Sequence, residues 1–227
     1  MNICSLLPSG TEIAFALGLG DSIVGVTDLC DYPDEAKNKP IVSRSRIDVS
    51  SLSSAEVETA MRNILVSGES PYTVDEELLA NSNIEIVLTQ DLCYFCEIDV
   101  GTVENTLVNL DVLPEVLVLN PRTLEEILTC IERVGVACCV PMVAQELLQG
   151  MRERIDTVAQ RINAVKDRPK VFSIEGVDPL VIGGHWISDV LNMVGVTAYQ
   201  PGCDAQRIKW HDVVEYAPDK LFIDLCS

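Results

Sequence analysis

The stretch ICSLLPSGTEIAFALGLGDSIVGVTDLCDYP, residues 3–33, decides the fold. Ile3–Leu7 is a short apolar run typical of a buried strand, and residues 8–21 follow with apolar side chains at helical spacing and with glycines that can end a helix. Ile23–Val26 is a second run of β-rich residues. Because strand, helix and strand in succession build a parallel sheet, this stretch predicts an α/β fold.

The alternation of strand and helix continues on both sides of a helical middle section. From Arg122 to Lys166 strand signals are almost absent, and apolar residues recur at helical spacing, which predicts a long helix in this section. The further elements that we expect are strands at Ile84–Leu88, Val116–Leu119, 170–174, 196–199 and 220–225, and helices at 53–68, Val103–Leu110, 185–195 and 210–217.

Together these elements predict two Rossmann-like α/β lobes with parallel sheets, joined by one long linker helix. We place the N-terminal lobe at residues 1–121, the helical linker with its long helix at 122–167, and the C-terminal lobe at 168–227. In open parallel sheets ligands bind at the carboxyl ends of the strands, so the loops at these ends are where we expect the functional residues.

Charge and composition exclude several classes of protein. The 35 acidic residues outnumber the 16 basic ones and give a net charge of −19, which would repel nucleic acid and anionic membrane surfaces. No apolar segment is long enough for membrane insertion. Nine cysteines without a recognisable secretory signal indicate a cytoplasmic protein, or a periplasmic or cell-surface one if the N-terminus is processed or incomplete.

Signatures of common enzymes are missing from the sequence. There is no phosphate-binding G-x-x-x-x-G-K-[ST], no G-x-S-x-G and no H-E-x-x-H, so we expect a binding protein that is not an enzyme and requires no cofactor.

A C-x-x-C pair in TQDLCYFCEID, residues 89–99, leaves a second function open. Redox motifs of this type stand at the start of a helix, whereas the next predicted helix begins no earlier than about Gly101. A site for zinc or an iron–sulfur cluster needs four ligands. The remaining alternative is that the thiols pack as small apolar side chains. A cytoplasmic metal-binding protein or redox enzyme would use the candidate ligands Cys30, Cys93, Cys96 and Cys226.

The opening stretch, together with SRSRID (residues 43–48), TQDLC (89–93) and GGHW (183–186), resembles the cobalamin and iron-siderophore class of ABC-transporter solute-binding proteins, in particular a cobalamin-binding-protein-like branch without an export signal. The resemblance implies two lobes bridged by a rigid helix, a corrinoid or related metal chelate held in the cleft between them, and an ABC-transporter permease as partner. Proteins of this class continue beyond the equivalent of Ser227, so we expect a second lobe that is truncated at its C-terminus.

The resemblance also implies which side chains contact the ligand. An indole such as that of Trp186 can stack on a flat macrocycle, and the imidazole of His185 can coordinate cobalt or iron. Guanidinium groups can bind carboxylates or phosphate, although Arg44 and Arg46 could instead pair with nearby aspartates. Packing of Trp186 at a helix start is the alternative to ligand contact. The expected ligand-binding residues are Trp186, His185, Tyr32, Arg44, Arg46, Gln90, Tyr94 and Glu175, with Tyr72 as a further aromatic contact.

Overall fold

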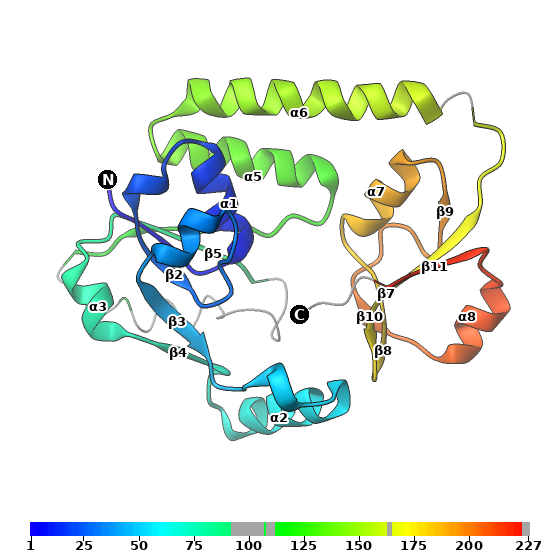
Figure 1. Cartoon of the computed structure of the whole chain (residues 1–227), viewed down its shortest axis with the longest axis horizontal. Coiled ribbons are helices and arrows are strands. Elements are labelled where there is room, and N and C mark those ends of the chain that lie inside the picture. Colours follow the sequence, from blue (N-terminus) through cyan, green and yellow to red (C-terminus); the bar gives the residue numbers. More distant parts are fainter. Residues whose placement is uncertain (92–106, 108–111, 163–164, 224–227) are drawn as a thin grey trace. The chain divides into compact units, whose positions relative to one another are not determined.

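The structure of the chain, a computed structural model, describes residues 1–91, 107, 112–162 and 165–223, and it divides into two compact units (Figure 1). The first lobe comprises Met1–Leu52, Thr59–Asn120 and Cys130–Leu147. The second lobe comprises Ser53–Glu58, Pro121–Thr129 and Leu148–Ser227. Each lobe has its own β-sheet, which confirms the predicted two-lobed α/β fold.

The first lobe is built on a six-stranded sheet with the strand order β4-β3-β2-β1-β5-β6. Neighbouring strands run parallel except β3 and β4, which are antiparallel. Strands β1, β2, β5 and β6 fall close to the predicted positions, whereas β3 and β4 were not predicted. The strands are β1 (Ile3–Ser5), β2 (Ile23–Thr27), β3 (Ile41–Ser45), β4 (Tyr72–Val74), β5 (Ile86–Thr89) and β6 (Glu115–Val118).

The helices of this part of the chain follow from local sequence signals. Helix α1 (Pro8–Ala16) begins at Pro8, whose missing N–H is not needed in the first turn, and the chain leaves the helix through Gly18 at φ 74°. Helix α2 (Ser54–Ser67) agrees with the prediction, and the short α3 (Glu76–Asn81) is capped by the Asp75 side chain. The described residues also form three 3₁₀ helices: η1 (Gly20–Ser22), η2 (Asp34–Asn38) and η3 (Val49–Ser51).

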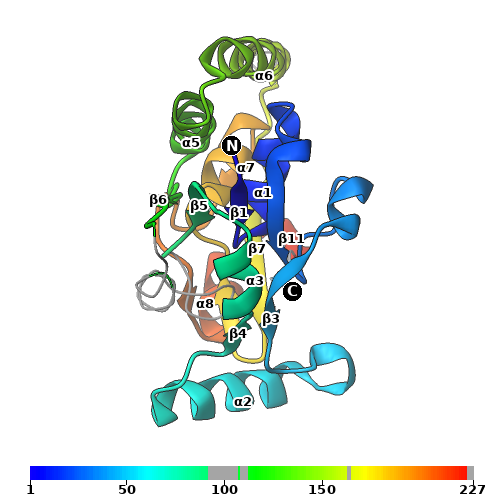
Figure 2. The ribbon, with the colours of Figure 1, turned by 90° about the vertical axis from the view of Figure 1, so that its left-hand side faces the viewer.

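Two helices form an antiparallel hairpin in the middle of the chain. Helix α5 (Leu124–Ala137) and helix α6 (Pro141–Ile162) lie side by side in Figure 1 and again in Figure 2. They approach closely because Gly135 has no side chain, and a methyl group added there would clash with Cβ of Ala144. The predicted long helix is therefore α6, and the segment that interrupts the helical pattern is the turn through Cys139 at φ 58°.

The second lobe has a five-stranded mixed sheet. Its order is β10-β8-β7-β11, with β9 also paired to β7, and β8 is antiparallel to both β7 and β10. The sequence predicts a parallel sheet, which holds only for β9, β7 and β11. The elements are β7 (Lys170–Val177), β8 (Leu180–Ile182), α7 (Ile187–Met193), β9 (Thr197–Ala198), β10 (Gln206–Arg207), α8 (Trp210–Tyr216) and β11 (Lys220–Ile223).

Each lobe has a separate apolar core. In the first lobe Cys4, Val42 and Val87 are buried on strands β1, β3 and β5, and Tyr72 is 8% exposed in the same cluster. Tyr72 therefore packs in the core of the first lobe, whereas the sequence suggested it as a further ligand contact. In the second lobe Phe172 is buried and its ring stacks on Tyr199 with ring centroids 4.7 Å apart. The predicted helix Val103–Leu110 lies, apart from Leu107, outside the described residues.

Candidate functional site

The GGHW segment forms a tightly packed loop between β8 and α7. A methyl group on Gly183 would lie 2.6 Å from Oγ of Ser173, and one on Gly184 would clash with the backbone of Ala205. At Gly184 two backbone segments approach so closely that only glycine fits. The backbone N–H of Gly184 donates a hydrogen bond of 3.3 Å to Oε1 of Glu175 on β7. The two glycines therefore allow the loop to pack closely against Ser173 and Ala205. The hydrogen bond to Glu175 holds the loop in this position.

His185 has an unusual backbone conformation, with φ at 52°. Its N–H donates to the carbonyl of Cys203 at 2.9 Å, and its own carbonyl accepts a 3.3 Å bond from Ser188 Oγ. The N–H of Gly202 donates to the same Ser188 hydroxyl oxygen at 2.9 Å. The left-handed backbone conformation costs free energy in a residue other than glycine, and it persists only where the surrounding structure holds it. The hydrogen bonds that link this loop to residues 202–203 hold His185 in that conformation.

The imidazole of His185 lies within a small charged cluster. Its Nε2 is 3.7 Å from Oδ1 of Asp204, and the guanidinium of Arg122 donates a hydrogen bond to the same carboxylate. Burial lowers the pKa of His185, Asp204 opposes this effect, and the positive charge of Arg122 adds to it. The hydrogen bond from Arg122 also keeps the pKa of Asp204 below its usual value. A neutral imidazole with a free lone pair is the form that can coordinate a metal ion.

Trp186 follows directly and stands at the start of α7, as predicted. Its indole is half-buried, and the centroids of the Trp186 and His185 rings are 5.8 Å apart with an interplanar angle of 33°. The two rings thus form one partly exposed aromatic pair on the second lobe.

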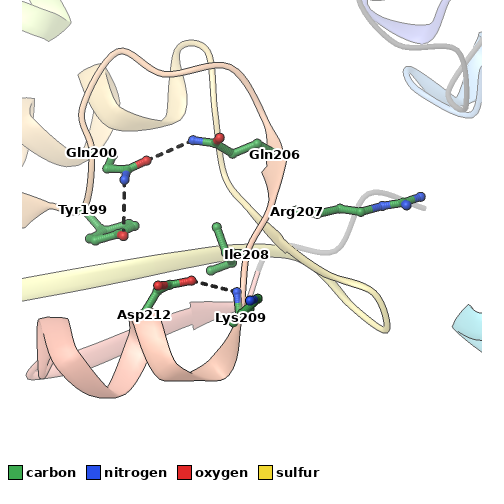
Figure 3. Close-up of a pocket in the computed structure, with 7 residues that line it drawn as sticks. All are labelled: Tyr199, Gln200, Gln206, Arg207, Ile208, Lys209 and Asp212. Atoms are coloured by element: carbon green, nitrogen blue, oxygen red, sulfur yellow. Dashed lines mark hydrogen bonds between the residues drawn. The ribbon is translucent and has the colours of Figure 1, made fainter.

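A pocket of about 420 Å³ lies in the second lobe, along the segment that follows β9 (Figure 3). The amide of Gln206 donates to Oε1 of Gln200 at 2.9 Å, and Nε2 of Gln200 donates to the Tyr199 hydroxyl at 3.3 Å. On the other side of the pocket the backbone N–H of Lys209 donates to Asp212 at 2.8 Å. The lining residues are Tyr199, Gln200, Gln206, Arg207, Ile208, Lys209 and Asp212.

Arg207 connects this pocket to helix α2. Its guanidinium forms an ion pair with Glu58, whose side chain is 17% exposed, and both residues belong to the second lobe. None of the pocket residues was predicted from the sequence as part of a site, and neither were Arg122 and Asp204. The position of Asp204 shortly after Pro-Gly could have suggested a turn with a functional side chain. Its pairing with Arg122 could not be predicted, because 82 residues separate the two in the sequence.

The candidate residues of the first lobe are spread over three segments. Tyr32 is 66% exposed in the loop after β2, and Gln90 is partly buried directly after β5. Arg44 is exposed on β3, and within the described part of the chain it makes no ion pair. Arg46 lies 4.0 Å from Glu69, whereas the alternative to ligand contact was an ion pair with the nearby Asp48 or Asp31.

Cys30 is the one candidate metal ligand that falls within the described residues. It is 4% exposed, and its Sγ lies 3.1 Å from Oγ1 of Thr11 and 3.4 Å from Oγ1 of Thr27. In the described ranges no group of three His, Cys, Asp or Glu side chains could hold a metal ion. The other predicted site residues Cys93, Tyr94, Cys96 and Cys226 lie outside the described residues.

The position of Glu175 in the fold differs from the sequence prediction. Glu175 was expected after the end of a strand but lies inside β7, which continues to Val177 before turning into β8. The predicted strand ended too early because Gly176 and Asp178-Pro179 are typical loop residues, whereas here they form the end of a hairpin.

Comparisons with known proteins agree with the resemblance found in the motifs. An uncharacterized ABC transporter substrate-binding lipoprotein of Bacillus subtilis is 32% identical over 224 residues, which are 96% of this chain and 60% of that protein. A vitamin B12-binding protein of Vibrio cholerae is 26% identical over 201 residues, 85% of this chain and 58% of its own length. No protein-family model matches the chain.

The fold is also shared with solved structures. The periplasmic heme-binding protein RhuT from Roseiflexus superposes with a TM-score of 0.71 at 19% identity, covering 98% of this chain and 75% of that one. The chain spans about three fifths of the length of the two curated relatives. The two curated relatives are named as a substrate-binding lipoprotein of an ABC transporter and a vitamin B12-binding protein, neither of which is an enzyme, in agreement with the expectation of a binding protein.

The relatives do not support the cytoplasmic location expected from the sequence, because their names describe a lipoprotein and periplasmic proteins. Within the described ranges, none of the helices combines the length and the apolar character that crossing a membrane requires. The comparisons do not favour the alternative of a metal or redox protein either.

Proposed function

We propose that this chain binds a corrinoid or a related metal chelate, that the His185–Trp186 pair of the second lobe contacts it, and that an ABC-transporter permease is its partner. The observation that carries the proposal is the presentation of an imidazole and an indole, 5.8 Å apart, on a loop fixed by two glycines. A flat macrocycle offers a large apolar face to an indole, and its metal offers a coordination position to an imidazole.

The electrostatics of the loop fit this role. Burial lowers the pKa of His185, so the imidazole stays neutral at a lower pH than usual. Its lone pair therefore remains available to a metal. The peripheral groups of a corrinoid are amides and a phosphate, for which the Gln200 and Gln206 amides and the Lys209 ammonium of the pocket are suitable partners. We therefore propose that the pocket in Figure 3 receives polar side arms of the ligand.

The names of the relatives support this ligand class. One is a vitamin B12-binding protein and one is a heme-binding protein, so both are named for a metal held in a large flat ring. The lipoprotein from Bacillus subtilis is named as part of an ABC transporter, which supports a permease as the partner and a place of action outside the cytoplasm.

Isothermal titration calorimetry with cyanocobalamin and, separately, with hemin tests the proposal. We expect saturable binding of one of them, and we expect Trp186→Ala and His185→Asn each to weaken it at least tenfold, which is about 1.4 kcal/mol. Asparagine is chosen at position 185 because it tolerates the positive φ.

The chain supplies its own matched controls, because it contains only two tryptophans and two histidines. Trp210→Ala and His211→Asn change the same residue types at exposed positions on α8 and should leave the affinity unchanged. Absence of a binding signal with both compounds would contradict the proposed ligand class. Binding that is insensitive to positions 185 and 186 would contradict the proposed site.

A further inference from the structure

The charges around the pocket in Figure 3 balance. Its charged lining residues are Arg207, Lys209 and Asp212, and the guanidinium of Arg207 forms an ion pair with Glu58 of α2. These four side chains contribute two positive and two negative charges. The pocket and its paired Glu58 therefore offer a ligand charged groups of both signs and no net charge.

The ion pair with Glu58 directs the Arg207 guanidinium away from the other pocket residues. The side chain of Glu58 is 17% exposed and that of Arg207 is 53% exposed. A largely buried carboxylate costs free energy unless a cation pairs with it, so this ion pair is favoured. In Figure 3 the side chain of Arg207 points away from Tyr199, Gln200 and Asp212. A ligand anion in the pocket could therefore use this guanidinium only by drawing it away from Glu58.

Neutral hydrogen-bonding groups line another side of the pocket (Figure 3). Nε2 of Gln206 donates to Oε1 of Gln200 at 2.9 Å, and Nε2 of Gln200 donates to the Tyr199 hydroxyl at 3.3 Å. Each bond uses one of the two N–H groups of its amide, and the Tyr199 oxygen accepts, so its O–H group remains a donor. Such uncharged groups match the C=O and N–H groups of a carboxamide without any charge to neutralise.

We propose that this pocket selects a metal chelate whose side arms are uncharged carboxamides over one whose side arms are carboxylates, and that the ion pair of Glu58 with Arg207 maintains this selectivity. The inference rests on the proposed function and narrows it to a corrinoid, because corrinoids carry amide side arms whereas heme carries carboxylates. Glu58 is then a specificity-determining residue that acts through Arg207 and does not itself contact the ligand.

Two electrostatic effects disfavour carboxylate side arms. A carboxylate that leaves water for the pocket loses its hydration, and a pocket without net positive charge does not compensate this loss. At longer range the net charge of −19 repels anions. Lys209 can serve a single anionic group such as a phosphodiester. The carboxylate of Asp212, which accepts a 2.8 Å hydrogen bond from the backbone N–H of Lys209, reduces its attraction for further anions.

Titration calorimetry with a matched pair of corrinoids tests the selectivity. The aquacyano forms of cobinamide and cobyrinic acid share the corrin ring and its cobalt, but cobinamide carries amides where cobyrinic acid carries carboxylates. We expect cobinamide to bind at least about tenfold more tightly. Equal affinities, or tighter binding of cobyrinic acid or of hemin, would overturn the inference and leave the proposed ligand class standing. Absence of binding with these compounds and with cyanocobalamin would contradict the proposed function itself, and this inference with it.

Glu58→Gln tests the residue that maintains the selectivity. The substitution keeps the shape of the side chain and removes its negative charge, so the surroundings of the pocket gain a net positive charge. We expect cobyrinic acid to bind about tenfold more tightly than it binds the wild-type chain, cobinamide to bind as before, and Arg207→Gln to cancel the gain in the double variant. Asp212→Asn removes a negative charge from the pocket itself and should shift the preference in the same direction.

Another ion pair of the same lobe supplies the matched control. Glu125→Gln breaks the pair between Glu125 Oε1 and Arg152 Nη2, which lie 3.0 Å apart, and neither residue is among those that line the pocket. This variant should keep the wild-type ratio of the two affinities. An unchanged ratio in both Glu58→Gln and Asp212→Asn, or an equal change in Glu125→Gln, would overturn the inference.

Discussion

The imidazole Nε2 of His185 lies 3.7 Å from the carboxylate Oδ1 of Asp204. This carboxylate raises the pKa of His185, against the lowering effects of burial and of Arg122. The balance between these groups makes the protonation of His185 sensitive to the 204 side chain.

Replacement of Asp204 by asparagine should lower the pKa of His185 further. The substitution removes the negative charge that favours the imidazolium and leaves burial and Arg122 in place. A titration of the imidazole proton resonances by NMR measures this shift, with His211→Asn used to assign the two histidines. An unchanged or higher pKa of His185 in Asp204→Asn would show that the contact does not act on the imidazole.

Acid should weaken the fold partly through His185. Because the pKa of His185 is lower in the folded than in the unfolded chain, the unfolded chain binds more protons near pH 6.5. The contribution of His185 to stability is therefore present above the unfolded pKa of 6.5 and is lost as the pH falls through the folded pKa. His185→Asn should show a shallower loss of unfolding free energy between about pH 7 and 5 in urea denaturation. Equal slopes for both chains would contradict this.

Two glycines should respond oppositely to alanine. At Gly184 a methyl group would clash with the backbone of Ala205, so Gly184→Ala should destabilise the second lobe by about 1–3 kcal/mol. At Gly150, inside α6, a methyl group meets no atom within 4 Å, so Gly150→Ala should stabilise by about 0.5–1 kcal/mol. Chemical denaturation measures both, and the prediction fails if the two variants shift the midpoint in the same direction.

The described cysteines should differ sharply in reactivity. Cys139 is exposed, whereas burial raises the pKa of Cys138 to about 11 and that of Cys4 to about 12. Since the thiolate is the reactive form, iodoacetamide at mildly alkaline pH should modify Cys139 in the native chain and leave the other two unmodified until denaturant is added. Mass spectrometry of the peptides reads this out. Modification of Cys4 as fast as that of Cys139 would refute the buried position of Cys4.

The sequence predicts those elements that carry a strong local signal. Residues 3–33 contain complete apolar runs and a glycine stop, and they fold into β1, α1 and β2 near the predicted bounds. Strands β3 and β4 were missed because Arg44 interrupts the apolar pattern in one and the other has three residues. The two-residue β10 exists only through its pairing with β8, which no local pattern reveals.

The site was predictable to a similar extent. His185 and Trp186 stand out because two glycines precede them in the sequence. The charges around His185 come from distant positions, Arg122 and Asp204, and only the folded chain brings them together. Arg44 and Arg46 attracted attention as cations in an acidic chain, but a sequence gives the charge of a side chain and not the direction in which it points.

Helices α5 and α6 each change lobe partway along their length, after Thr129 in one and after Leu147 in the other. The turn between the two helices thus belongs to the first lobe. The N-terminal part of α5 and the C-terminal part of α6 belong to the second lobe. A gene divided at any single codon could not encode the two lobes as two separate intact pieces, because the residue ranges of the lobes alternate along the chain. Recombination between related genes could therefore exchange one lobe of this protein only by making several crossovers at once.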